Sequence, residues 1–371
     1  MRRQRELGKS RVAVVGLGKQ GILLIERLAR RDDVELVGVV DVAADKVGRS
    51  LDDVAGAPTG FDLEVADALD AVADAHVALV ATSSRIADVG PQLERIAALG
   101  VNAITTSEEL AYPWHEFPEE SRRLDDVARA NGVSVIGCGS NPGFLMDLVP
   151  IVFSFGCERV DSITIRRSLD MRPHRPERLA RFALGLTPEE FERVDRSVLV
   201  GHVGFTQSMH CVADAFGWAL ERTHEEPVRP VAVTDVQRRG HHVTLEPGTV
   251  AVIEHAAWAQ CDGKRIIDLA MYFGFHDAGD PIGHGDVYEI RASDQTVRVR
   301  AEPSWSPFTA TPSTVVNLIG AIRSARPGLV SVTDFPAAAL AAAGGGVVAD
   351  EALAIDNYLA RLAVRETGAR A

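Results

Sequence analysis

Cysteine is scarce in this sequence, and its placement excludes two kinds of protein. The four cysteines are scattered and form no CxxC pair: Cys138, Cys157, Cys211 and Cys261. A disulfide scaffold and a structural zinc site both need closely patterned cysteines. The histidines show no metal-ligand spacing either. We therefore expect a reduced, cytoplasmic protein without a bound metal.

Long apolar runs and excess positive charge are also missing. No apolar run is long enough to cross a bilayer, and the basic residues 1–11 contain no apolar stretch like that of a secretory signal. The net charge is −13, whereas nucleic-acid binding requires a basic surface. We expect neither a membrane nor a nucleic acid as a partner. The chain is long enough for about two domains.

A glycine-rich turn near the start of the chain is the strongest motif. Gly16, Gly18 and Gly21 follow the apolar residues 12–15 in the spacing GxGxxG, before an apolar helical pattern at 22–29. Strand, turn and helix in this order are the context of a dinucleotide-binding motif. The first glycine permits the tight turn, the second lets backbone approach a pyrophosphate, and the third permits close packing of helix and strand. The other predicted cofactor contacts of the turn are Leu17, Lys19 and Gln20.

An acidic residue follows this motif at the expected distance. The apolar run 34–40 ends in Asp41, where an acid binds a ribose diol. Because a carboxylate there repels a 2′-phosphate, we expect NAD as the cofactor. Lys46 and Arg49 lie nearby and leave NADP open as the alternative.

The order of predicted elements indicates two fold types in one chain. Strands and helices alternate up to about residue 145, with a helix expected at 43–54 and a short strand at 61–65, which predicts an α/β Rossmann fold with a doubly wound parallel sheet. Strand-like segments dominate 160–303 and predict an α+β domain with a mostly antiparallel sheet. We expect a dinucleotide-binding domain at 1–145, a substrate and dimerisation domain at 146–305, and a helical return at 306–371 that packs on the first domain. A terminal helix is expected at 350–365.

Polar residues at the carboxyl ends of the predicted parallel strands are candidates for the site, because a dinucleotide binds at that edge of the sheet. Thr82, Ser83 and Ser84 follow one strand, where a nicotinamide ribose would rest. Thr105 ends the next strand, and Asn141 follows the last. We predict that all five contact the cofactor.

Two acidic residues come almost directly after Thr105. In one interpretation, Glu108 or Glu109 faces the nicotinamide, and burial raises its pKa so that it exchanges protons near neutrality. In the other, one or both are acids in the first turn of a helix, where they interact favourably with its dipole.

Three further features allow both a functional and an ordinary interpretation. The turn 141–143 either aims Phe144 and Met146 into the cleft or is a plain loop. His202 is either a pocket residue or an exposed loop histidine. A group of arginines either clamps a substrate carboxylate or forms a solvated face: Arg166, Arg167, Arg172 and Arg175.

The segments TTSEELAYPW (105–114) and GSNPGFLMD (139–147), together with GLGKQG, carry a family resemblance. The sequence resembles the native amine dehydrogenases and 2,4-diaminopentanoate dehydrogenases, relatives of dihydrodipicolinate reductase. Later segments are also similar to that family: SLDMRPHRP, GLTPEEF, GHVGF, TATPSTVVNLIGAI and RPGLVSVTDFP.

The resemblance implies an NAD(P)H-dependent homodimer that catalyses reversible reductive amination of a small ketone or aldehyde with ammonia. In that family a glutamate just after the strand is the acid and base, which falls on Glu108, with Glu109 as second choice. A carboxylate suits the cationic intermediate of such a reaction. The family's pocket residues fall on Phe144, Met146, His202, Thr309 and Asn317.

Other functions remain as alternatives. The arginine- and proline-rich stretch after Ser168 departs from the diaminopentanoate enzymes and leaves the substrate open. The alternative functions are that of a 2,4-diaminopentanoate dehydrogenase, or that of another oxidoreductase like dihydrodipicolinate reductase or homoserine dehydrogenase. True dihydrodipicolinate reductase activity is disfavoured because no lysine follows His241 and His242. An alternative of another class is a non-catalytic NAD-binding sensor.

Overall fold

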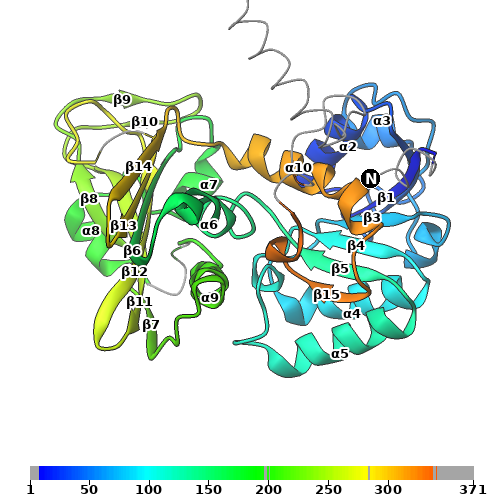
Figure 1. Ribbon diagram of the computed structural model, residues 1–371. Coiled ribbons are helices and arrows are strands. Elements are labelled where there is room, and N and C mark those ends of the chain that lie inside the picture. The colour runs from blue at the N-terminus through cyan, green and yellow to red at the C-terminus, as the bar shows by residue number, and fades with distance from the viewer. Residues whose placement is uncertain (1–7, 196–198, 200, 283–284, 337–339, 341–371) are drawn as a thin grey trace, which may run out of the picture.

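The computed structural model describes residues 8–195, 199, 201–282, 285–336 and 340, which form two lobes (Figure 1). The first lobe holds a six-stranded sheet in the order β15-β5-β4-β3-β1-β2, in which all neighbouring strands are parallel. Its strands are β1 (Ser10–Val15), β2 (Val34–Val40), β3 (Val77–Val80), β4 (Asn102–Thr105), β5 (Ser134–Gly137) and β15 (Gly328–Val330).

Helices cover both faces of this sheet, which explains why the central residues of its inner strands are apolar. One face packs against α2 (Lys19–Leu28), α10 (Pro307–Asn317) and α11 (Ile319–Ile322). The other face packs against α4 (Ile86–Ala98) and α5 (Pro118–Ala130). Shorter helices connect the strands: α3 (Leu51–Ala55), η1 (Leu69–Val72), η2 (Glu108–Leu110) and η4 (Val332–Asp334). The parallel sheet with helices on both faces confirms the predicted Rossmann-type fold.

The second lobe is built on a seven-stranded sheet in the order β14-β13-β6-β12-β11-β7, with β8 also paired to β11. All its pairs are antiparallel except β6 with β12, so the predicted mostly antiparallel sheet is confirmed. Its strands are β6 (Val160–Asp170), β7 (Arg222–Glu225), β8 (Arg229–Val233), β11 (Val250–Cys261), β12 (Lys264–Gly274), β13 (Gly285–Ala292) and β14 (Thr296–Ala301). A separate hairpin-like pair is β9 (Arg238–Arg239) with β10 (Thr244–Leu245).

Helices of the second lobe share one core with its sheet. Phe182, Phe191 and Phe205 are fully buried together with strand residues such as Ile165 and Ile267. The helices are α6 (Leu148–Phe153), η3 (Ser154–Gly156), α7 (Pro176–Ala180), α8 (Pro188–Arg193) and α9 (Phe205–Phe216). Figure 1 shows α9 on the side of this lobe that faces the first one.

The chain returns to the first lobe through α10, as Figure 1 shows in orange. The return is not only helical: β15 adds a sixth strand beside β5, with Gly328 opposite Ser134. This strand has three residues, too few to show a pattern in the sequence. The terminal helix expected at 350–365 lies outside the described residues.

Two local predictions in the first lobe are wrong. Only α3 forms within the helix expected at 43–54, because Gly48 has φ +75° and interrupts it; a serine N-cap, Ser50, then starts the helix by accepting from Asp53 N. The strand expected at 61–65 is reduced to two isolated bridges, which pair Glu64 with Ser50 and Ala66 with Val40. The segment therefore follows the sheet edge without joining it.

Candidate active site

The glycine-rich turn after β1 is closed at both ends and open in the middle. Gly16 has φ +88°, and a Cβ atom there would lie 2.7 Å from the Ala81 carbonyl oxygen. A Cβ on Gly21 would lie 1.9 Å from the Gly16 oxygen. At Gly18, by contrast, no atom of the described residues lies within 4 Å of the Cβ position. The turn thus leaves free space directly in front of the N-terminus of α2, and the first turn of that helix contains no acid.

Asp41 is fixed against this turn from the end of β2. Its carboxylate accepts hydrogen bonds from Leu17 N (2.7 Å), Ala43 N (2.8 Å) and Lys46 Nζ (2.8 Å). Burial opposes ionisation, but the bonds from Lys46, Ala43 and Leu17 outweigh it and hold the pKa of Asp41 below its usual range. A carboxylate therefore stands at the ribose position beside an open helix N-terminus, which is the donor set that a dinucleotide requires. These residues fit NAD(P).

The other predicted cofactor contacts lie at the same sheet edge. Thr82 donates to Gln92 Oε1 (3.0 Å) and Ser83 to Asp88 Oδ2 (2.8 Å), so both hydroxyls are engaged with α4. Lys19 Nζ lies 3.5 Å from the centre of the Phe308 ring. Thr105 is fully buried, and its hydroxyl accepts from Ser107 N (3.2 Å).

The structure separates the two candidate glutamates. Glu109 accepts a 2.7 Å hydrogen bond from Ile86 N, so its carboxylate caps the start of α4. Glu108 is half-buried and accepts a hydrogen bond from the Ser84 hydroxyl. Burial raises the pKa of Glu108, the charge of Glu109 adds to the rise, and the Ser84 bond and the charge of Arg178 oppose it. Glu109 thus interacts with the start of α4, whereas the dipole interpretation placed it in the first turn of its own helix, and Glu108 is the carboxyl group whose pKa is raised.

Residues of the second lobe pack directly on Glu108. A Cβ on Gly204 would lie 3.4 Å from Glu108 Cβ and 2.6 Å from Pro142 Cδ. Gly204 has φ +105° and precedes α9. The GHVG segment, the turn 141–143 and Glu108 thus meet where the two lobes contact each other.

The turn 141–143 is held by a residue that the sequence analysis missed. Asp147 is buried and accepts from Gly143 N (2.6 Å), Leu148 N (2.8 Å) and the Ser208 hydroxyl (3.3 Å). This network fixes the position of Phe144, whose ring meets Trp305 edge-on at 6.2 Å. Met146 is fully buried, and its Sδ lies 3.3 Å from Asn141 Nδ2.

His202 is half-buried rather than an exposed loop histidine. Its Nε2 lies 2.7 Å from Asn141 Nδ2, and its backbone N donates to His255 Nδ1 at 2.8 Å. Burial lowers the pKa of His202 to about 3, so the ring is neutral at physiological pH. His255, which the sequence analysis did not single out, holds this loop from β11.

The two remaining pocket candidates occupy opposite ends of α10. Thr309 lies exposed in its first turn. Asn317 lies in its last turn, where its Oδ1 accepts from Arg31 Nη1 at 3.5 Å. Arg31 follows the far end of α2, about 15 Å along that helix from the glycine turn. Asn317 therefore lies at the far end of α2 from the glycine turn, against its prediction as a pocket residue.

The sequence of this chain is similar to those of known dehydrogenases. Residues 144–347 match the family model of the 2,4-diaminopentanoate dehydrogenase C-terminal domain. The 2,4-diaminopentanoate dehydrogenase of Acetoanaerobium sticklandii is 33% identical over 333 residues, which cover 88% of this chain and 94% of the relative. The chain belongs to the 2,4-diaminopentanoate dehydrogenase family. It is an NAD(P)-dependent oxidoreductase of a family that acts on amines.

Solved structures share the fold of this family member. An amine dehydrogenase from Mycobacterium smegmatis superposes with a TM-score of 0.71 at 23% identity, covering 89% of this chain and 97% of that one. GenD2 from gentamicin A biosynthesis, solved with NAD, superposes with a TM-score of 0.53 at 15% identity, covering 90% and 91%. At these identities the superpositions show the fold alone.

The arginines in β6 and in the segment after it do not act as one clamp in this family member. Arg167 is buried and pairs with Asp286 at 3.2 Å, and Arg172 pairs with Asp170 at 3.3 Å. Both are structural. Arg178 in α7, which was not singled out, has an exposed side chain close enough to Glu108 and Lys19 to change their pKa values. Arg178 is therefore a cation within electrostatic reach of Glu108.

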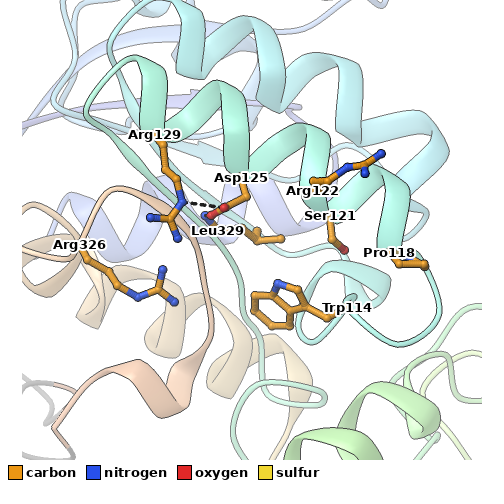
Figure 2. Close-up of a pocket in the computed structure, with 8 residues that line it drawn as sticks. All are labelled: Trp114, Pro118, Ser121, Arg122, Asp125, Arg129, Arg326 and Leu329. Carbon is orange, nitrogen blue, oxygen red and sulfur yellow. Dashed lines mark hydrogen bonds and ion pairs between the residues drawn. The ribbon is translucent and has the colours of Figure 1, made fainter.

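A separate cavity of about 320 Å³ lies on the first lobe beside α5 and β15 (Figure 2). It contains no candidate residue of the active site. Figure 2 shows Asp125 joined to Arg129, with Trp114 below them and Arg326 approaching from the turn before β15. The ion pair from Asp125 to Arg129 measures 2.6 Å.

In the described part of the chain, no helix is both long and apolar enough to span a membrane. Nor do three or more histidine, cysteine, aspartate or glutamate side chains in that part gather closely enough to hold a metal ion.

Proposed function

We propose that this protein catalyses the reversible reductive amination of a small ketone or aldehyde with ammonia, with Glu108 as acid and base. One observation carries the proposal: Glu108 is a half-buried carboxyl group with a raised pKa where the two lobes meet, while its neighbour Glu109 accepts a hydrogen bond from Ile86 N. A raised pKa brings a carboxyl group closer to neutrality, where it both accepts and donates protons efficiently.

The cofactor site is proposed on the glycine turn and Asp41. When bound there, NAD(P) supplies the hydride for reduction and accepts it in the reverse direction. We propose a preference for NAD, because the Asp41 carboxylate repels a 2′-phosphate; the 2.8 Å bond from Lys46 weakens but does not remove that charge. The further contacts proposed are Thr82, Ser83 and Asn141.

Glu108 moves the protons of the amination. Ammonia adds to the carbonyl carbon, and the Glu108 carboxylate takes a proton from the new ammonium group and passes it to the oxygen, which becomes a hydroxyl. Glu108 then takes up a second proton from solvent and donates it to that hydroxyl, the carbon–oxygen bond breaks and water leaves. The carboxylate, ionised again, stabilises the positive charge of the iminium group. A lysine in its place would oppose that charge.

The surroundings of Glu108 support this assignment. His202 has a pKa of about 3 and is thereby unsuited to donate protons at neutral pH. Phe144 and Met146 make the pocket apolar on the side of the turn 141–143, which suits a short alkyl chain. We propose both as pocket residues, together with His202 and Thr309.

A second candidate substrate is favoured by Arg178. A guanidinium group within electrostatic reach of Glu108 suits a substrate that carries a carboxylate as well as an amine. The relative from Acetoanaerobium sticklandii is named for such a compound, 2,4-diaminopentanoate. We also propose that the protein works as a homodimer with the domain boundaries given above, which light scattering and limited proteolysis test.

The test is NADH consumption with a panel of small ketones and aldehydes, including oxo acids, with and without ammonium. Turnover that requires ammonium supports the proposal, and faster turnover of the oxo acids supports the second substrate class. Ammonium-independent reduction of the carbonyl compounds contradicts it and favours an alcohol-forming oxidoreductase. NADH binding without turnover of any compound favours the sensor hypothesis.

A further inference from the structure

Helix α9 presents one face to the segment that follows Glu108 in the chain. Gln207, His210 and Asp214 are spaced by three and four residues and so lie on the same side of the helix. Gln207 donates to the carboxylate of Glu116. The His210 ring stacks on the ring of His115, with centroids 4.0 Å apart and planes at 10°.

Asp214, the last residue of this face, makes two hydrogen-bond contacts with the first lobe. One oxygen of Asp214, Oδ2, accepts from the Tyr112 hydroxyl at 2.7 Å and lies 3.0 Å from His115 Nε2. These two bonds join the second lobe to the chain four and seven residues after Glu108. Burial opposes the charge of Asp214, but the bonds from His115 and Tyr112 lower its pKa.

The opposite end of the same helix touches Glu108 itself. Gly204, the residue before α9, lies against Glu108 and Pro142, where a Cβ would meet Glu108 Cβ at 3.4 Å. The helix therefore contacts the η2 turn at its start and holds the continuation of that turn near its end. A shift at the Asp214 end moves the packing that buries Glu108.

We propose that Asp214 is a positioning residue, which holds the Glu108 turn against the second lobe through Tyr112 and His115. The proposal rests on the acid and base role proposed for Glu108. Asp214 touches no reacting atom and acts on the reaction only through the position and burial of Glu108.

Different charged and titratable groups surround Asp214 and Glu108. Asp214 faces Tyr112 and His115 from the first lobe, and His210 lies on its own helix. Glu108 faces Glu109 on its own turn and Arg178 on α7, and it accepts a hydrogen bond from Ser84. Replacement of Asp214 changes none of the groups around Glu108 directly, so a change in the titration of Glu108 reports a change in its burial.

The experiment compares Asp214→Ala, Asp214→Asn and the control Asp70→Ala. Asp70 forms an ion pair with Arg95 at 2.5 Å that is also exposed but lies within the first lobe. We expect Asp214→Ala to lower kcat about 10-fold, because two hydrogen bonds to a charged acceptor are lost. Asp214→Asn keeps an oxygen in the same place and restores most of kcat. Asp70→Ala leaves kcat unchanged.

The pH profile separates positioning from plain stabilisation. Looser packing admits water to Glu108 and lowers its pKa, so the acidic limb of kcat moves to lower pH in Asp214→Ala. A variant with a lower Tm, an unchanged limb and unchanged kcat would overturn the proposal. If Asp214→Ala does not fold, Tyr112→Phe removes one of the two bonds and must show a smaller shift in the same direction. The positioning proposal does not require Asp214→Ala to lose all ammonium-dependent turnover. Full activity of Glu108→Gln, in contrast, would contradict the proposed function itself.

Discussion

Substitution of Gly18 by alanine tests the proposed cofactor site without disturbing the fold. Gly18 has φ −73° and ψ −171°, which alanine adopts freely, and its Cβ meets no described atom within 4 Å. We expect the free energy of unfolding to change by no more than about 0.5 kcal/mol, because the loss of glycine entropy in the unfolded chain offsets the weaker N-cap. Gly21→Ala, in contrast, forces a Cβ to 1.9 Å from the Gly16 oxygen and costs about 3 kcal/mol or more.

The same methyl group at Gly18 occupies the space that a pyrophosphate needs. Phosphate bound at this helix N-terminus gains from the free N–H groups and the dipole, and a methyl group moves it away from both. We expect the Kd for NADH to rise at least about 10-fold, which corresponds to about 1.4 kcal/mol. Calorimetric titration with NADH measures this change, and thermal unfolding of the same sample measures the stability.

Gly156→Ala is the matched control. Gly156 also has free space at its Cβ position, lies exposed in the second lobe and takes no part in the candidate site. Its substitution must leave the Kd for NADH unchanged. A folded Gly18→Ala variant that binds NADH as tightly as the wild type would refute the placement of the cofactor phosphates.

Three further predictions concern charged groups. Asp41→Ser raises the ratio of kcat/KM with NADPH to kcat/KM with NADH at least about 10-fold, measured in parallel initial-rate assays, because the charge that repels a 2′-phosphate is removed. Arg167→Leu lowers the free energy of unfolding in urea by about 3 kcal/mol, because it leaves the fully buried Asp286 without its cation. Because burial raises the pKa of Glu108, the acidic limb of kcat/KM for the wild type reports a pKa above the ordinary 4.5 of a glutamate. Activity falls as the pH drops through this pKa, and Glu108→Gln removes the limb.

The parts of the site that were predictable from the sequence are local. Gly16, Gly18 and Gly21 follow a strand and begin a helix within six residues, so their roles depend on a turn that the sequence spells out. Asp41 directly follows β2, Glu108 follows β4 three residues after its end, and parallel strands place their carboxyl ends at one sheet edge.

The parts that were missed depend on contacts between distant segments. Asp147 meets Ser208 across 61 residues, His202 meets His255 across 53, and the Thr311 hydroxyl accepts from Ser140 N across 171. No local pattern signals such pairs. Asn317 shows the converse error: it shares α10 with Thr309, but eight residues of helix separate them by about 12 Å.

We propose that Glu108, and not Glu109, moves the protons. The rate of ammonium-dependent NADH oxidation at saturating carbonyl substrate, measured for Glu108→Gln and Glu109→Gln, tests this proposal. We expect Glu108→Gln to lower kcat at least about 100-fold, the usual contribution of a general acid or base. We expect Glu109→Gln to keep most of kcat, because the amide oxygen still accepts from Ile86 N. Full activity in Glu108→Gln, or loss of activity confined to Glu109→Gln, would contradict the proposal.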